Sequence, residues 1–157
     1  MGNIEKGYLG SLIVEKAFIN NGFNIFKPSM ENGKVDMIIE KDYVYLKLQI
    51  KTVQMSKNGK IIPVRKISHN MGTYKVSRYT NFDINYFIGV DIETEDLYIL
   101  PVSFSSEYKS SISINKCSDY KNNFNLMELN IENDINVEDN IGELLTVNAD
   151  DNTEGIE

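Results

Sequence analysis

Residues 35–53 have the sequence VDMIIEKDYVYLKLQIKTV, and this stretch decides the fold. From Val44 to Val53 it alternates apolar and polar residues, which is typical of a strand with one buried face. Residues 35–39 are mostly apolar and predict a second strand, entered through the turn at 31–33 and left through Lys41-Asp42. We expect the two strands to pair as a hairpin.

The polar residues of this hairpin are predicted to meet on one face. Successive strand residues point to opposite faces of a sheet. One face of this strand therefore carries Lys47, Gln49 and Lys51, and the other carries Leu46, Leu48 and Ile50. Pairing of the strands brings Asp36 beside Gln49 and Lys51. A carboxylate, an amide and an ammonium so placed can hold a divalent cation and a water molecule. An ordinary cross-strand ion pair between Asp36 and Lys51 explains the spacing as well, so the spacing alone leaves both interpretations open.

Length and composition predict one soluble domain. The 157 residues are 41% apolar, which is enough to form a core. No apolar run is long enough to cross a membrane, and the N-terminus has no signal-peptide pattern. The single cysteine, Cys117, excludes an internal disulfide, and with one histidine in the chain it excludes a Cys/His zinc set. We therefore expect a cytoplasmic protein.

The charge is distributed unevenly. The net charge is −7, but ten acids fall within residues 128–157, and no Lys or Arg follows Lys121. Residues 43–82, called the basic segment below, contain eight Lys or Arg and no Asp or Glu. Such a segment favours phosphate binding, although a solvated basic face has the same composition. The candidate DNA contacts are Lys47, Lys57, Lys60, Arg65, Lys66, His69, Lys75 and Arg78.

The remaining pattern predicts a helix over residues 3–21 with Asn3 as a possible N-cap, and a short strand over 23–26. Residues 68–72 are expected to form an exposed loop, and 74–79 to be either strand or helix. Two further strands, 86–90 and 97–100, flank an acidic turn, so Asp91 and Glu93 are interpreted as a hairpin end rather than as catalytic acids. We predict a domain over residues 1–130 and an acidic, mobile tail over 131–157.

Four short motifs occur in this order: Gly7–Gly10, Gly22–Pro28, Val35–Ile39 and Leu48–Thr52. Together they resemble the PD-(D/E)XK nuclease superfamily. The nearer likeness is to its small members, namely the bacterial group I intron homing endonuclease of this class, in which Gln replaces the middle acid, and the Holliday-junction-resolvase-like nucleases. The resemblance implies an α/β, restriction-endonuclease-like core, with a mixed β-sheet flanked by α-helices. It also implies hydrolysis of double-stranded DNA with Mg²⁺ by a homodimer or homotetramer.

The resemblance assigns roles residue by residue. Asp36, Gln49 and the carbonyl of Ile50 would hold Mg²⁺, and Lys51 would orient or deprotonate the attacking water.

The chain departs from this pattern at Ser11, where related sequences have a Glu that completes the metal site. Glu15 lies about 40° around the helix and about 6 Å along it from Ser11, so it can face the same way. Glu15 then either replaces the missing acid or is a surface acid paired with a nearby lysine. If nothing replaces that acid, the protein is a catalytically weak or inactive DNA-binding protein on a nuclease scaffold. Junction resolution is a further alternative, and a DNA-mimicking inhibitor is a weaker one.

Overall fold

The computed structural model describes residues 2–29, 33–70 and 73–128, and between 66 and 77 it describes the backbone alone. The chain divides into two units, Met1–Phe124 and Asn125–Glu157, and the fold below is that of the first. The predicted boundary at residue 130 and the predicted tail over 131–157 lie outside the described residues. Among the helices that are described, none is both long and apolar enough to cross a membrane.

The first element is α1, Asn3–Asn20, close to the predicted helix over 3–21. Gly2, not Asn3, is the N-cap, and its N–H donates to the Glu5 carboxylate at 2.7 Å. The helix ends where the Asn21 amide donates to the Ala17 carbonyl at 2.8 Å and Gly22 takes a φ of +79°. Glycine adopts this left-handed conformation at little cost, so the chain can turn directly into the first strand.

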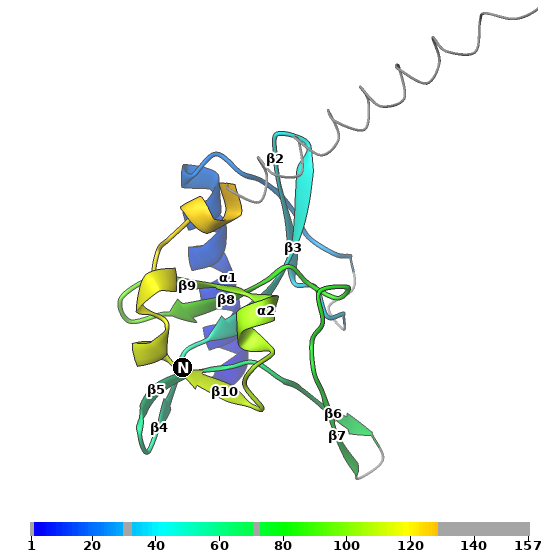
Figure 1. Cartoon of the computed structure of the whole chain (residues 1–157), viewed down its shortest axis with the longest axis vertical. Coiled ribbons are helices and arrows are strands. Elements are labelled where there is room, and N and C mark those ends of the chain that lie inside the picture. Colours follow the sequence, from blue (N-terminus) through cyan, green and yellow to red (C-terminus); the bar gives the residue numbers. More distant parts are fainter. Residues whose placement is uncertain (1, 30–32, 71–72, 129–157) are drawn as a thin grey trace, which may run out of the picture. The chain divides into compact units, whose positions relative to one another are not determined.

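A five-stranded mixed sheet forms the centre of the unit, in the order β1-β2-β3-β8-β9 (Figure 1). The expected hairpin is present, with Met37 opposite Leu48 and Lys41 opposite Val44. Strands β3 and β8 pair in parallel, whereas the other neighbours are antiparallel, which confirms the predicted mixed α/β architecture. The strands are β1 Asn24–Phe26, β2 Met37–Lys41, β3 Val44–Thr52, β8 Tyr86–Asp91 and β9 Asp96–Pro101.

Two glycines allow close packing on the two faces of this sheet. A Cβ on Gly10 of α1 would lie 2.9 Å from Val90 and 3.0 Å from Thr52, so α1 approaches the face that carries these residues. A Cβ on Gly89 would lie 2.6 Å from the Ile62 side chain. Gly89 and Val90 are neighbours on β8 and face opposite ways, so Ile62 covers the face opposite α1.

Ile62 belongs to a second, three-stranded sheet, ordered β10-β5-β4. Strands β4 (Gln54–Ser56) and β5 (Gly59–Pro63) form a hairpin, and β10 (Ser111–Ser113) pairs with β5. The short elements α2 (Val102–Ser105), η1 (Ile114–Lys116) and η2 (Ser118–Tyr120) complete the unit.

Part of the basic segment forms a hairpin of its own, β6 (Lys66–Asn70) with β7 (Thr73–Ser77), which lies apart from the central sheet (Figure 1). The predicted loop over 68–72 is therefore wrong for residues 68–70, which are strand. The alternation of Lys66–Asn70 is too short and too polar to be recognised as a strand without its partner. The undecided stretch 74–79 is strand up to Ser77.

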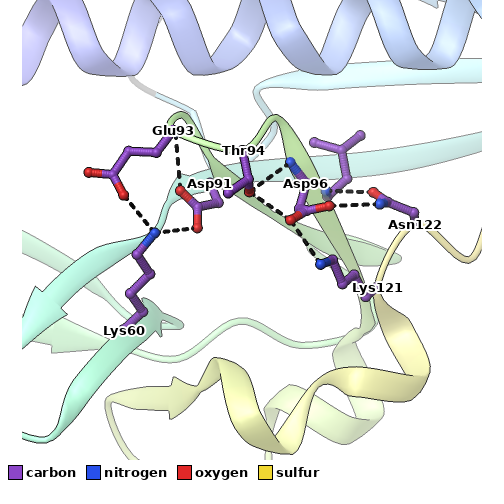
Figure 2. A network of polar contacts seen from close by, with 8 residues as sticks. Lys60, Asp91, Glu93, Thr94, Asp96, Lys121 and Asn122 are labelled. Carbon is purple, nitrogen blue, oxygen red and sulfur yellow. Dashed lines mark hydrogen bonds and ion pairs between the residues drawn. The ribbon is translucent and has the colours of Figure 1, made fainter.

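Figure 2 shows polar contacts around the turn between β8 and β9. The Lys60 ammonium lies 2.7 Å from both Asp91 and Glu93, and the Asp91 carboxylate is the main cause that raises the pKa of Lys60. This arrangement agrees with the interpretation of Asp91 and Glu93 as a hairpin end. Two acids from outside the basic segment thus already engage the charge of Lys60, which stays a predicted DNA contact.

Candidate active site

Asp36 and Gln49 meet in a hydrogen-bonded cluster at the start of β2. The Asp36 N–H donates to the Leu48 carbonyl at 2.9 Å, which extends the β2–β3 ladder by one residue. The Asp36 Oδ2 accepts from the Ile50 N–H at 2.8 Å and from the Gln49 amide Nε2. Gln49 is 4% exposed, whereas Asp36 is only partly buried. The predicted meeting of Asp36 and Gln49 is present in the structure.

Tyr79 is the third side chain of this cluster. Its hydroxyl donates to the Gln49 Oε1 at 2.9 Å, and its ring packs edge-on against Phe87 with the centroids 4.9 Å apart. Burial, and then the negative charges of Asp36 and Asp83, raise the pKa of Tyr79 to about 12. The hydroxyl therefore keeps its proton at neutral pH and remains able to donate.

Sequence reasoning did not find Tyr79 as a site residue. The structure places it in the core at 4% exposure. The available signal was chemical: a buried tyrosine hydroxyl requires a polar partner, and the oxygen of a glutamine amide such as Gln49 can accept from it.

Two lysines lie beside the cluster. The ammonium groups of Lys51 and Lys34 each lie 6.0 Å from the centre of the Tyr79 ring. Lys34 also pairs with Asp83 at 2.7 Å, which lowers the pKa of that carboxyl. The Lys51 ammonium thus lies near Tyr79, the residue whose hydroxyl bonds to Gln49. Lys34 and Asp83 were not predicted, because they lie in loops without a periodic pattern.

A pocket of about 400 Å³ opens between α1 and the Asp36 segment. Its lining includes Ser11 from α1, Asp36, Ile50 of β3 and Lys27. The Ser11 hydroxyl donates to the Gly7 carbonyl of its own helix at 3.2 Å. Ser11 therefore faces the same pocket as Asp36 and presents no carboxylate to it.

Glu15 is not part of that pocket lining. Its carboxylate pairs with the Lys27 ammonium at 2.5 Å. The sequence left two alternatives for Glu15, and this contact is the one in which the acid pairs with a nearby lysine.

The family model of the PD-(D/E)XK endonucleases matches residues 1–128, which is most of the chain. The chain belongs to the PD-(D/E)XK endonuclease family. The positions that carried the resemblance, Asp36, Gln49 and Lys51, all fall within the matched range. A comparison with curated protein sequences gave no significant match.

A solved structure supports the family fold. The chain is similar to "a bacterial homing endonuclease: I-Ssp6803I", with 23% sequence identity, a TM-score of 0.66, and coverage of 71% of this chain and 77% of the other. The expected restriction-endonuclease-like architecture is thereby confirmed.

The residues of this PD-(D/E)XK site fit a hard divalent cation, which prefers oxygen ligands. The Asp36 carboxylate supplies such oxygens, whereas the Gln49 amide oxygen accepts from the Tyr79 hydroxyl and the amide nitrogen faces Asp36. No cluster of three or more His, Cys, Asp or Glu occurs within 2–29, 33–70 and 73–128.

The predicted DNA contacts fall into different environments. Lys57 and Arg78 are exposed and Arg65 is half-buried. Lys47 donates to the Phe82 carbonyl at 2.6 Å, so this ammonium fixes the loop that follows Tyr79. The side chains of Lys66, His69 and Lys75 lie outside the described residues.

Proposed function

We propose that this protein is a site-specific endonuclease, similar to homing endonucleases, that hydrolyses phosphodiester bonds of double-stranded DNA with Mg²⁺. The observation that carries the proposal is the cluster of Asp36 with Gln49 and the Ile50 backbone, in a chain that belongs to a nuclease family. The likeness to a bacterial homing endonuclease and the basic segment both support DNA as the substrate.

In this proposal each residue of the site has its own role. Asp36, Gln49 and the carbonyl of Ile50 hold the cation, which when bound stabilises the negative charge that develops on the phosphate. Lys51 orients the attacking water or takes its proton. The pocket beside Asp36 admits the scissile phosphate, and Lys27, which lines this pocket, is paired with Glu15. Lys57, Arg65 and Arg78 contact the DNA backbone.

The test is cleavage of a diverse duplex DNA library in Mg²⁺, with Asp36→Ala and Lys51→Ala as site variants. The matched control is Lys16→Ala, because Lys16 is an exposed lysine on α1 that pairs with Glu95. We expect cleavage by the wild type and by Lys16→Ala and none by the two site variants. Cleavage that persists in both site variants would overturn the proposal.

A second candidate is a DNA-binding protein that does not cut. Three contacts favour it: Ser11 bonds to its own helix, Glu15 is paired with Lys27, and the Gln49 amide presents nitrogen to Asp36. Ser11→Glu separates the candidates, with Ser11→Gln as the uncharged control of nearly equal size. If the site is otherwise competent, Ser11→Glu raises the cleavage rate and Ser11→Gln does not. If the scaffold is inactive, neither variant cuts.

The substrate and the assembly require two further measurements. Cleavage of both strands requires two active sites, which a homodimer or homotetramer supplies. Light scattering of the purified protein, alone and with DNA, gives its mass. A panel containing duplexes and four-way junctions distinguishes site-specific cutting from junction resolution, since a resolvase cuts the junction and spares the linear duplex.

A further inference from the structure

The orientation of the Gln49 amide follows from its two neighbours. An ionised carboxylate has only acceptors, so the group that faces Asp36 Oδ2 is the amide NH₂. The amide oxygen then faces Tyr79, whose hydroxyl donates to it at 2.9 Å. The opposite orientation would place a carbonyl oxygen against a carboxylate oxygen, two groups that both only accept hydrogen bonds. Tyr79, Gln49 and Asp36 therefore form a directed chain of donors and acceptors.

This orientation is the reverse of what a ligand must have. An amide binds a cation through its oxygen, yet here the NH₂ group occupies the side toward Asp36. We propose that the Gln49 amide turns over when a divalent cation binds, and that Tyr79 is the positioning residue that partners it in both orientations. In the turned state, the amide NH₂ donates to Tyr79, whose hydroxyl changes from donor to acceptor. The inference deepens the proposed function and rests on it.

The side chains allow such a turn. The terminal torsion of glutamine is broad and roughly two-fold, so both orientations are accessible without a strained rotamer. A tyrosine hydroxyl is able to donate and to accept. Both residues are 4% exposed, so no bulk water can replace Tyr79 as a partner. Without the hydroxyl, the amide would lose a hydrogen bond in either orientation, which is costly in a buried position.

Gln49→Glu removes the need for the turn and is the matched variant. A glutamate at this position has two oxygens, so Tyr79 remains a donor with and without cation. The added negative charge also attracts the cation. We expect Gln49→Glu to bind Mg²⁺ more tightly than the wild type, with no change in the role of the Tyr79 hydroxyl.

The direct experiment is NMR of the full chain with ¹⁵N-labelled glutamine side chains, titrated with Mg²⁺ alone. The Gln49 amide signal is assigned by its loss in Gln49→Glu. We expect contacts from the Gln49 NH₂ protons to the Tyr79 ring to strengthen as Mg²⁺ is added. Calorimetry on the same sample measures binding independently. Binding without any change in these contacts overturns the inference and leaves the proposed function standing. Absence of both Mg²⁺ binding and cleavage overturns both.

Raman spectroscopy supplies a second readout. If Tyr79 had only a structural role, this readout would not change when Mg²⁺ is added. The tyrosine Fermi doublet changes its intensity ratio between hydroxyls that donate and hydroxyls that accept. The chain has nine tyrosines, so the Tyr79 contribution is obtained by subtracting the Tyr79→Phe spectrum. Adding Mg²⁺ should shift the intensity ratio of the Tyr79 doublet toward the value of an accepting hydroxyl in the wild type and leave this ratio unchanged in Gln49→Glu. An unchanged ratio in the wild type contradicts the inference. If Tyr79→Phe does not fold, the change in the doublet ratio on adding Mg²⁺ is compared directly between the wild type and Gln49→Glu.

Discussion

Gly89→Ala tests the packing of the second sheet against the strand beside Lys51. The new Cβ would lie 2.6 Å from Ile62 Cδ1 and 2.9 Å from Cγ1, well inside the optimum carbon separation of about 3.5–4.0 Å. Ile62 is fully buried, so it cannot move into solvent. Overpacking of this kind costs about 1–3 kcal/mol, and the lower chain entropy of alanine offsets about 0.4–1 kcal/mol. We expect a net loss of about 1–2 kcal/mol in unfolding free energy.

The assay is urea unfolding of the full chain, with Gly89→Ala, Ile62→Ala and the double variant. Ile62→Ala removes the atoms that clash, so the double variant should lose less stability than the sum of the two singles, by about 1–2 kcal/mol. Gly7→Ala is the matched control, because its Cβ meets nothing within 4 Å on the exposed side of α1. It should stabilise the protein by about 0.5–1 kcal/mol. Additive losses, or Gly89→Ala as stable as the wild type, would refute the packing.

Three more predictions concern the buried cluster and the charged surface. Tyr79→Phe leaves the Gln49 Oε1 without its donor and should lower the unfolding free energy by about 1–3 kcal/mol, measured in urea. The Thr94 hydroxyl, and then Lys121, lower the pKa of Asp96 below its ordinary 3.8, so this carboxylate stabilises the fold above about pH 4. That stability is lost as the pH falls through the folded pKa, and Asp96→Asn should flatten the acid limb of a pH–stability curve. Lys57→Ala should reduce the slope of log affinity for DNA against log salt concentration by the contribution of about one phosphate contact. Lys60→Ala should not reduce it, because two carboxylates hold Lys60.

The sequence predicted the centre of the fold because its signals there are local. The alternation of β3 and the turn before it define a hairpin register by themselves, and this register places Asp36 beside Gln49. The helix α1 is also marked locally, by its apolar spacing and its terminal Asn-Gly. Residues that lie within one hairpin are therefore predictable from spacing alone.

Contacts between distant segments were not predictable in this way. Tyr79 reaches Gln49 from 30 positions along the chain, and Lys60 reaches Asp91 from 31. Neither pair belongs to a local pattern, and each exists only because the second sheet and its connections pack on the central one. The partner of Glu15 was left open for the same reason, since Lys27 comes from the segment after β1.

The most direct test of the account is the rate of Mg²⁺-dependent phosphodiester cleavage in Lys51→Ala, measured together with DNA affinity. The account predicts that Lys51→Ala still binds DNA within a few-fold of the wild type but no longer cuts it, while Lys16→Ala does both. Cleavage by Lys51→Ala at the wild-type rate would contradict the assignment of this site.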